Sequence, residues 1–500
     1  MAEVVSSQPS SMHVRRAPRG RRLVHGVATL SAAQLIGHLC SFGRNVLLAR
    51  LLGPVDFGIA AAFAAIVVGL EMISDLSMDK LVVQSPRGDD PSFLRVLHGL
   101  MLVRAVILSA LLFVLGGVLA HALHAPEAIN AFRALAIIPL VRGFLNIDVI
   151  RAHRQLRFAP SAFVDAVPQV VTLALTVPAV AFIGSFWAVF WLLLLRAALA
   201  TGSSHLLATQ RWRIGWNRGD TREAIRFGWP LLLNGMMMFA IIHADKLVVG
   251  STCDLSTLAS YAVAAMLASM PALLLARAVG SAYFPMLASC QHDAHRFRTR
   301  SRMILALYAA LGVIAVAGLI VVGEPIVRLV FGNAYAPAIA IIPWFAAVHA
   351  LRLYRAGITM IALARGDSTT SLLANLVRAP ALLVQIPVAI MTGSPLAIIF
   401  VALIAEVPSI IVALHRIRTR HGVAMRDVAV PAILLMTACL ALIIVSSGST
   451  VTVLPWLRMT AALTLAATVL FAMLVTMPTS DRRTMQRTLI DSMLPEQSPC

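Results

Sequence analysis

Charged residues are scarce in this sequence. Asp, Glu, Lys and Arg make up 13% of the 500 residues, whereas a soluble domain carries about 25%. Hydrophobic residues make up 59%, and the mean hydropathy is +0.86. Such a composition excludes an ordinary soluble domain and indicates a chain whose natural solvent is lipid.

Cysteine is also scarce, and the signatures of common enzymes are missing. The five cysteines are odd in number and lack the spacing of a disulfide framework or a zinc site. They are Cys40, Cys253, Cys290, Cys439 and Cys500. No HExxH, GxxxxGK[ST] or GxSxG motif occurs, so a zinc protease, an ATP-driven pump and a hydrolase have no support. We therefore expect no catalytic residue, no metal site and no bound cofactor.

Acidic residues are fewer than basic ones, 22 against 41, which gives a net charge of +19. Whether this excess serves nucleic acid binding or membrane orientation depends on where the charges lie. A transmembrane helix needs about 20 mostly apolar residues, and on that template about fourteen segments are predicted to span. They are residues 24–48, 57–78, 96–120, 128–149, 160–182, 186–208, 227–249, 257–280, 303–323, 338–362, 372–391, 396–414, 428–446 and 456–477.

The basic residues are distributed unevenly between the two sides that these spans define. Of the 41 Lys and Arg residues, 28 fall on the side of the termini, and Arg50, Arg328 and Arg458 alone fall in loops on the other side. Cytoplasmic loops of membrane proteins collect Lys and Arg, so we expect both termini in the cytoplasm. The same bias explains the net charge without a nucleic acid partner.

The spans predict an all-α polytopic membrane protein, and the internal repeat and family resemblance described below imply that it forms two pseudo-symmetric six-helix bundles followed by two additional helices. We expect a disordered basic cytoplasmic N-terminus (1–23), an N-terminal lobe (24–215), a C-terminal lobe (216–420), two additional helices (421–478) and a cytoplasmic tail (479–500). The outside loops are too short to hold a domain, so any function must lie within the membrane.

A weak internal repeat supports the two lobes. The stretch "GRNVLLARLLGPVDFGIAAAF" is similar to "ADKLVVGSTCDLSTLASYAVAAML", with Arg44-Asn45 opposite Asp245-Lys246. Both copies start on the inside, so the two units run in parallel, an arrangement that places a transporter's site where its halves meet. Chance recurrence of apolar residues is the alternative interpretation.

Two blocks of the sequence carry a family resemblance. "LLARLLGPVDFGIAAAFAAIVVGLEMISDLSMDKLVVQSP" and "FGWPLLLNGMMMFAIIHADKLVVG" resemble the Wzx-type flippases. These form the polysaccharide transporter branch of the multidrug/oligosaccharidyl-lipid/polysaccharide (MOP) superfamily, which is related to MATE exporters and lipid II flippases. In lipid II flippases an Arg-Asp pair ends the first helix, whereas here Arg44-Asn45 lacks the acid.

The resemblance implies a fold, a place and a substrate. The fold would be two bundles around a central cavity in the bacterial inner membrane, working by alternating access. The substrate would be an undecaprenyl-pyrophosphate-linked oligosaccharide, moved from the cytoplasmic to the outer leaflet in O-antigen, capsule or exopolysaccharide biosynthesis. Expected partners are this lipid-linked oligosaccharide, membrane lipid and other polysaccharide assembly proteins.

Basic residues inside the spans are the candidates for binding such a substrate. A diphosphate must cross about 30 Å of hydrocarbon, and the planar arginine fork donates two parallel hydrogen bonds to phosphate oxygens. The candidates are Arg44, Arg142, Arg196, Arg352 and Arg355. Arg352 and Arg355 share a helix face. The alternative is that these arginines pair with acids or extend to the inner surface, which we prefer for Arg277 and Arg378.

Acidic residues inside the spans leave two interpretations open. Glu71, Asp75 and Asp79 recur every four residues, which predicts one polar stripe on the second helix, and Glu406 lies in the middle of the twelfth span. These acids either neutralise facing arginines or bind a coupling proton or sodium ion.

The adjacent pair Asp245-Lys246 lies towards the outer end of the seventh span. We expect the pair to form a gate where the two halves meet, with an interfacial anchor as the alternative. Neighbouring side chains on a helix point in different directions, so the two residues should find different partners.

Three rival functions remain. A membrane polymerase or ligase would need a large outer loop, which this sequence lacks. A cation-coupled multidrug or metabolite exporter of the same fold would favour acids over arginines in its cavity. A scaffold without transport would leave the embedded charges unexplained.

Overall fold

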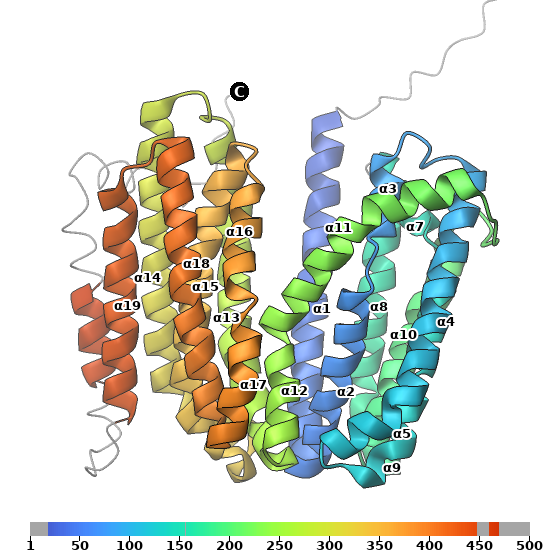
Figure 1. The fold of residues 1–500 in the computed structure, drawn as a ribbon, viewed down its shortest axis with the longest axis horizontal. Helices are drawn as coiled ribbons and strands as arrows, with labels where there is room; N and C mark the ends of the chain where they lie inside the picture. The colour runs from blue at the N-terminus through green and yellow to red at the C-terminus, as the bar shows by residue number, and fades with distance from the viewer. Residues whose placement is uncertain (1–18, 156, 448–459, 470–500) are drawn as a thin grey trace, which may run out of the picture.

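The computed structural model describes residues 19–155, 157–447 and 460–469, and the regular structure of this part of the chain is helical (Figure 1). The all-α class is therefore confirmed. The predicted N-terminal segment up to residue 18 and the predicted tail (479–500) lie outside the described residues, as does most of the fourteenth predicted span.

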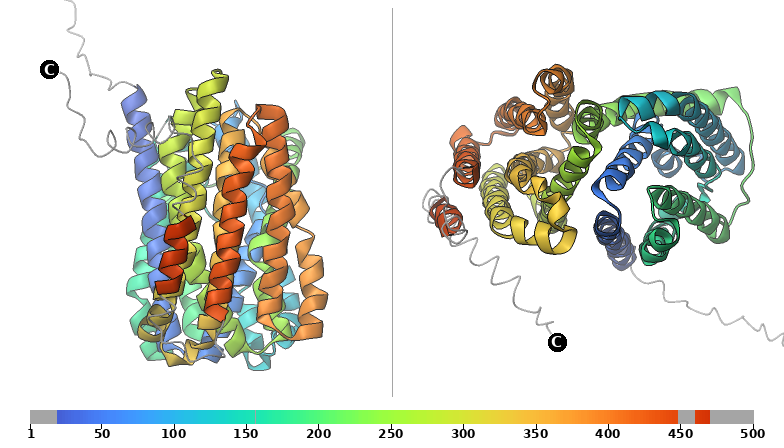
Figure 2. Two further views of the ribbon diagram at one scale, coloured as in Figure 1. Left: turned by 90° about the vertical axis from the view of Figure 1, so that its left-hand side faces the viewer. Right: turned by 90° about the horizontal axis from the view of Figure 1, so that it is seen from below.

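The helices form two groups that lie side by side (Figure 2, right). We call the first group the N-lobe; it contains α1 (Arg19–Leu51), α2 (Pro54–Ile73), α3 (Met78–Gln84), α4 (Pro91–Ala122), α5 (Ile129–Ala134), α6 (Ile137–Gly143), α7 (Asp148–Arg151), α8 (Ala159–Ala174), α9 (Thr176–Ile183) and α10 (Trp187–Leu207). The short segments η1 (Pro126–Ala128) and η2 (Ala152–Gln155) complete it.

The second group, the C-lobe, follows the linking helix α11 (Arg218–Ile242). It contains α12 (Ala244–Thr252), α13 (Leu255–Ala288), α14 (Ala294–Ile326), η3 (Val327–Phe331), η4 (Asn333–Tyr335), α15 (Pro337–Ala364), α16 (Thr369–Arg378), α17 (Ala381–Thr392), α18 (Pro395–His421) and α19 (Met425–Ser447). Helix α19 and the apolar helix Thr460–Val469 lie at the outer edge of this lobe (Figure 2, right).

The part of the chain that the structure describes does not confirm the expected number of fourteen membrane spans. In the described residues, ten helices are long and apolar enough to cross a membrane, or up to twelve if two bent helix pairs each count as one span. The bent pairs are Pro126–Gly143 with Asp148–Gln155, at 48°, and Ala159–Ala174 with Thr176–Ile183, at 47°. Helix α1 is not among the ten or the twelve, because its apolar run is interrupted by polar and basic residues.

Local chemistry explains where several helices begin and end. Proline occupies the first turn of α2, α4, α15 and α18, where its missing N–H costs no hydrogen bond. The Asp90 and Asn217 side chains accept hydrogen bonds from the first amides of α4 and α11. Gly393 and Gly422 end α17 and α18 in the left-handed region, at φ +57° and +66°, which glycine adopts without steric cost.

The two lobes contact each other at the end of the bundle where α1 ends and α2 begins, which we call the short-loop end (bottom of Figure 1). The Tyr335 hydroxyl donates a hydrogen bond to the Ala49 carbonyl at 2.8 Å, and the Tyr335 ring packs edge-on against Phe57 at 5.9 Å between centroids. Gly58 on α2 lies so close to the Leu255 backbone of α13 that an added Cβ would be 2.2 Å from its carbonyl oxygen. The lobes are therefore closely packed at this end.

Helix α11 crosses the front of the molecule from one lobe to the other (Figure 1). Its first half packs on the N-lobe: Asp220 forms an ion pair with Arg87, and Glu223 accepts a hydrogen bond from Ser85 at 3.2 Å. Gly235 allows close contact, because a Cβ there would lie 2.1 Å from the Met72 carbonyl oxygen. The helix breaks at His243, so the predicted seventh span is divided between α11 and α12.

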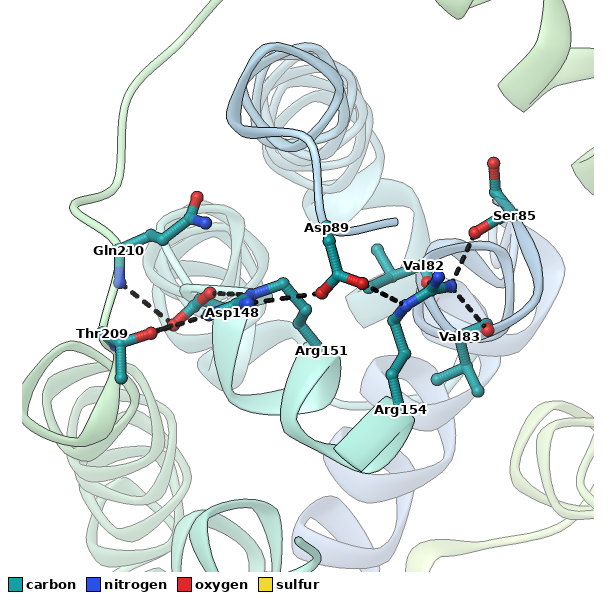
Figure 3. A network of polar contacts seen from close by, with 9 residues as sticks. All are labelled: Val82, Val83, Ser85, Asp89, Asp148, Arg151, Arg154, Thr209 and Gln210. Carbon is teal, nitrogen blue, oxygen red and sulfur yellow. Dashed lines mark hydrogen bonds and ion pairs between the residues drawn. The ribbon is translucent and has the colours of Figure 1, made fainter. Parts of the chain in front are cut away.

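The opposite end of the bundle, where α1 begins, carries most of the arginines outside the spans, and we call it the basic end. Here Asp148 accepts hydrogen bonds from Arg151 Nε at 2.6 Å and from the Thr209 and Gln210 amides at 2.7 and 3.1 Å (Figure 3). Arg154 pairs with Asp89 at 2.9 Å and donates to the Val82, Val83 and Ser85 carbonyls at the end of α3. This network ties α3, α7 and the chain after α10 together.

Replacing Asp148 by Asn is expected to destabilise the protein by about 1–2 kcal/mol, because the ion pair with Arg151 is lost and the hydrogen bonds from the Thr209 and Gln210 amides no longer end on a charged oxygen. The measurement is the thermal unfolding midpoint of the purified protein in detergent. Asp293→Asn is a suitable control, since Asp293 caps α14 as an exposed residue. Equal midpoints for the Asp148 variant and the wild type would contradict a stabilising role for this network.

A second carboxylate at the basic end, Asp367, caps α16. It accepts hydrogen bonds from the Thr369 and Thr370 amides at 3.0 and 3.2 Å and from both threonine hydroxyls. Burial alone would raise the pKa of Asp367, but the hydrogen bonds from Thr369, Thr370 and His421 hold that pKa well below its usual range. The charged carboxylate therefore stabilises this end at neutral pH, and that contribution is lost only as the pH falls through the lowered pKa.

Candidate functional site

A cavity of about 310 Å³ lies between the two lobes, and we call it the central cavity. Helices α1, α2 and α10 of the N-lobe line one side, and α11, α12, α13 and α15 line the other. The α2 wall is built from small residues, Ala60, Ala61, Ala64 and Ala65, whose short side chains leave the space open. The cavity thus lies where the internal repeat predicted a site.

The charged lining of the central cavity is mostly basic. Arg44, Lys246 and Arg352 line it, and Asp245 is the one acid among its lining residues. With the two lining histidines neutral, the cavity carries an excess of two positive charges. Four of the candidate residues, Arg44 of the N-lobe and Asp245, Lys246 and Arg352 of the C-lobe, are therefore brought together here.

Each charged group of the central cavity is held by a partner. Arg44 is 7% exposed and donates to the Thr172 hydroxyl at 3.3 Å. Asp245 accepts a hydrogen bond from the Tyr261 hydroxyl at 2.8 Å, whereas Lys246 Nζ lies 3.4 Å from His243 Nδ1. The neighbours Asp245 and Lys246 thus find different partners, Tyr261 on α13 and His243 at the helix break.

Arg352 joins the central cavity to a buried ion cluster in the C-lobe. Its Nε donates to Glu406 at 2.8 Å, and Arg355 Nε lies 3.4 Å from the same carboxylate. Arg378 also pairs with Glu406, which is fully buried on α18. Arg352 and Arg355 share a face of α15 as their spacing predicts, but in this structure Arg355 does not line the cavity.

Arg142 lies elsewhere, in a separate pocket of about 430 Å³ within the N-lobe. It pairs there with Glu71 of α2. Arg104, in the same pocket, donates to the Ser74 hydroxyl at 3.0 Å and lies 3.8 Å from Asp75. For Arg142 the structure thus shows the alternative of pairing with an acid.

The expected single stripe of Glu71, Asp75 and Asp79 on one helix is wrong. Helix α2 ends at Ile73, and Asp79 lies on the separate helix α3. The Asp75 carboxylate accepts a hydrogen bond from the Ser77 amide at 2.8 Å, and Ser77 has a left-handed φ of +48°, so the chain turns between the two helices. The three acids still line the same N-lobe pocket.

Arg196 is half-buried on α10 and does not line either cavity. With the Gln169 amide oxygen facing it, Arg196 donates from Nε and Nη2 at 3.2 and 2.6 Å. Of the arginines expected near the inner ends, Arg378 pairs with Glu406, whereas the exposed Arg277 donates to Gln34 at 3.3 Å.

Three polar residues of these sites were not identified as candidates from the sequence. His349 lines the central cavity one turn before Arg352, and this i, i+3 spacing is a signal that identifies it. Arg104 shared with the candidates its position inside a predicted span. Tyr261 gave no signal, because an aromatic residue on an apolar helix is normally part of the core, and its hydroxyl partner Asp245 is 16 residues away.

The geometry suits binding of an anion rather than chemistry on it. Cationic side chains from both lobes face a cavity of about 310 Å³ whose other walls are mostly apolar, so their attraction for an anion is screened less than at a surface. An anion held between Arg44 and Arg352 would contact both halves of the molecule at once. The central cavity is therefore the candidate functional site.

Comparison with known proteins places the chain in a family. The model of a family described as "Polysaccharide biosynthesis protein" matches residues 47–340. The succinoglycan biosynthesis transport protein ExoT of Rhizobium meliloti is 24% identical over 299 residues, which cover 58% of this chain and 59% of that protein. The chain therefore spans less than two thirds of the length of this curated relative.

Solved structures share the fold. The lipid II flippase MurJ in its inward closed conformation superposes with a TM-score of 0.69 at 13% identity, covering 92% of this chain and 99% of that one. An inward-facing multidrug resistance MATE family transporter of the MOP superfamily gives a TM-score of 0.60 at 14% identity, covering 79% and 98%. The fold is that of the MOP superfamily, as the two sequence blocks suggested.

Proposed function

Because this chain belongs to the polysaccharide biosynthesis protein family, we propose that it is a membrane transporter that flips a lipid-linked oligosaccharide. The substrate is a polyprenyl-diphosphate carrying a sugar repeat unit, and the direction is from the cytoplasmic to the outer leaflet of the bacterial inner membrane. The proposal adds to family membership a substrate, a direction and a binding site.

The observation that carries the proposal is the positive charge of the central cavity. A diphosphate loses its hydration when it leaves water, and buried cations offset that loss. Arg44 and Arg352 supply charge-assisted donors, which form the stronger hydrogen bonds to phosphate oxygens. Because these donors come from opposite lobes, binding of the diphosphate is coupled to the arrangement of the lobes.

The positions of the lobe contacts support the direction. We place the basic end in the cytoplasm, as the excess of Lys and Arg there favours. The packing of Tyr335 and Gly58 then closes the outer side, and the substrate enters from the cytoplasmic side. Movement to the outer leaflet requires these contacts to separate and the lobes to meet at the basic end instead.

A cation-coupled drug exporter of the same fold is the alternative, and the central cavity argues against it. A cationic drug would meet two arginines and a lysine against one acid, so the electrostatic energy would oppose binding. A proton or sodium gradient nevertheless remains a candidate energy source, with the N-lobe acids Glu71, Asp75 and Asp79 as its proposed binding groups.

Reconstitution into vesicles tests the function. A fluorescent polyprenyl-diphosphate-linked sugar is placed in both leaflets, and a membrane-impermeant quencher is added outside. The fluorescence of the inner-leaflet lipid should be lost faster in vesicles with protein than in empty ones, because the protein moves that lipid to the outer leaflet. We expect at least a tenfold faster quenching, about 1.4 kcal/mol in barrier height. Parallel vesicles with an imposed sodium or proton gradient identify the coupling ion.

A fluorescent phosphatidylcholine is the control for leaks and for general lipid scrambling. Quenching of the diphosphate-linked sugar at the rate of empty vesicles, under every gradient, would refute the proposed function. Equal acceleration of both lipids would also refute it, because a cationic cavity has no reason to bind a zwitterionic headgroup.

A further inference from the structure

The buried cluster around Glu406 has more arginines than its single carboxylate can neutralise. Arg352, Arg355 and Arg378 converge on Glu406, from α15 and α16. Glu406 is 0% exposed and Arg378 is 4% exposed. Three positive charges on one negative charge leave an excess of two in a low-dielectric interior, where repulsion between arginines is screened poorly.

The hydrogen bonds of the cluster are incomplete as well. Among the described residues, Arg378 Nε is buried without a hydrogen-bond partner, and the buried Arg355 Nε and Glu406 Oε2 lie 3.4 Å apart without the geometry of a hydrogen bond. Buried polar atoms nearly always have one, and exceptions call for an explanation. Arg352 is the most exposed of the three arginines, at 21% of its side chain against 12% for Arg355 and 5% for Arg378, so it is the one placed to take a second role.

Arg352 is the member of the cluster that also lines the central cavity. Its Nε donates to Glu406 and its Nη2 donates to the Ile241 carbonyl at 3.3 Å. Its Nη1 makes no hydrogen bond within the described residues and is not fully buried. One donor of Arg352 is thus available to a bound anion while another is held by Glu406.

We propose that Glu406 is an internal competitor of the substrate's diphosphate for Arg352. When the diphosphate enters the cavity, Arg352 turns from Glu406 towards the phosphate oxygens, and when the substrate leaves, Glu406 takes it back. This inference rests on the proposed function and adds to it a positioning residue that sets affinity. A transporter needs such a limit, because a diphosphate bound too tightly is not released.

The extra arginines make the exchange possible. If Arg352 were the single partner of Glu406, the departure of Arg352 would leave the buried carboxylate of Glu406 without a compensating charge, which is strongly unfavourable. Here Arg355 and Arg378 continue to neutralise Glu406, and Asn375 keeps Arg355 in place through a hydrogen bond of 3.2 Å. The departure of Arg352 also reduces the repulsion among the three arginines.

The test is the affinity of the full-length protein for farnesyl diphosphate in phosphatidylcholine nanodiscs. Arg378→Gln should weaken binding by roughly 3–10-fold, because Glu406 then holds Arg352 more strongly, and 10-fold corresponds to about 1.4 kcal/mol. Its thermal midpoint should not fall, since the buried excess charge decreases. Glu406→Gln should have the opposite effect, tighter binding by roughly 3–10-fold with slower dissociation.

The opposite signs separate this inference from a merely structural cluster, which would lower the midpoint and the affinity together in both variants. Arg277→Gln, an exposed arginine on α13, is the matched control and should bind as the wild type does. Inorganic pyrophosphate as a competitor shows whether the headgroup alone is recognised: displacement of farnesyl diphosphate supports competition for Arg352, and no displacement overturns it.

The outcomes for the inference and for the proposed function are distinguishable. If the wild type binds farnesyl diphosphate but Arg378→Gln binds equally or better, the competitor role of Glu406 is wrong and the proposed function stands. If the wild type binds no diphosphate at all, both are wrong. Should Glu406→Gln fail to fold, Arg378→Gln decides: weaker binding at an unchanged thermal midpoint supports the competitor role, and weaker binding with a lowered midpoint overturns it.

Discussion

A strain whose single gene copy carries Arg44→Gln together with Arg352→Gln is expected to lose its surface polysaccharide. The double substitution removes two of the three cations that line the central cavity. The charge of Lys246 then balances that of Asp245, so the cavity's excess positive charge falls to zero. A charge-assisted hydrogen bond contributes about 1.5–3 kcal/mol. Two lost bonds correspond to at least a roughly 100-fold decrease in binding of the diphosphate.

The measurement is the amount of extracted polysaccharide relative to the amount of tagged protein in the membrane, so that failure to insert is not mistaken for failure to transport. Arg328→Gln is the matched control, since Arg328 pairs with Glu324 at 2.9 Å on the exposed end of the C-lobe. Arg142→Gln reports on the N-lobe pocket. Normal polymer from the double variant, with loss in Arg142→Gln, would move the binding site to that pocket.

Gly58→Val is expected to open the short-loop end of the protein and to lower its stability by about 3 kcal/mol, the upper end of the typical cost of overpacking. An added Cβ at Gly58 meets the Leu255 carbonyl oxygen at 2.2 Å and its carbonyl carbon at 2.9 Å. These are backbone atoms at the start of α13 and cannot rotate away as a side chain can. Relief therefore requires the lobes to separate.

Two measurements check this, the thermal midpoint and the labelling of a cysteine placed at Ala61 in the central cavity, in a Cys253→Ser background. An impermeant maleimide added from the side of the short-loop end should react faster in the Gly58 variant. Gly202→Ala is the control, because nothing lies within 4 Å of its added Cβ and alanine stabilises a helix by up to about 1 kcal/mol over glycine. Unchanged labelling in Gly58→Val would show that this contact does not close the short-loop end.

The class of the fold could be predicted from the sequence because lipid imposes a strong rule on each span separately. A helix in hydrocarbon must satisfy its own backbone hydrogen bonds and present apolar side chains, so most spans appear as apolar runs without knowledge of their neighbours. The shared face of Arg352 and Arg355 was predictable for a similar reason, since helical periodicity is local. Both arginines reach Glu406 as a result.

What depends on contacts between distant segments was not predictable. The pairing of Arg142 with Glu71 joins residues 71 positions apart and placed this arginine outside the central cavity. The helix end at Ile73 and the break at His243 fall inside the second and seventh predicted spans, because the hydropathy template averages over about 20 residues and does not register where the backbone turns. In these places tertiary packing overrides the local pattern. The sequence therefore identified charged residues within spans as candidates, but it did not identify the residues with which they pair.

The lengths of the longest helices have a consequence for how the protein meets its surroundings. Helices α1 and α14 have 33 residues and α13 has 34, which at 1.5 Å per residue makes them about 50 Å long. A bilayer with its headgroups measures about 40–45 Å. The bundle therefore stands taller than the membrane, and its arginine-rich rim reaches into the water, so that the glycan of the proposed substrate would meet protein walls before its phosphates leave the lipid surface.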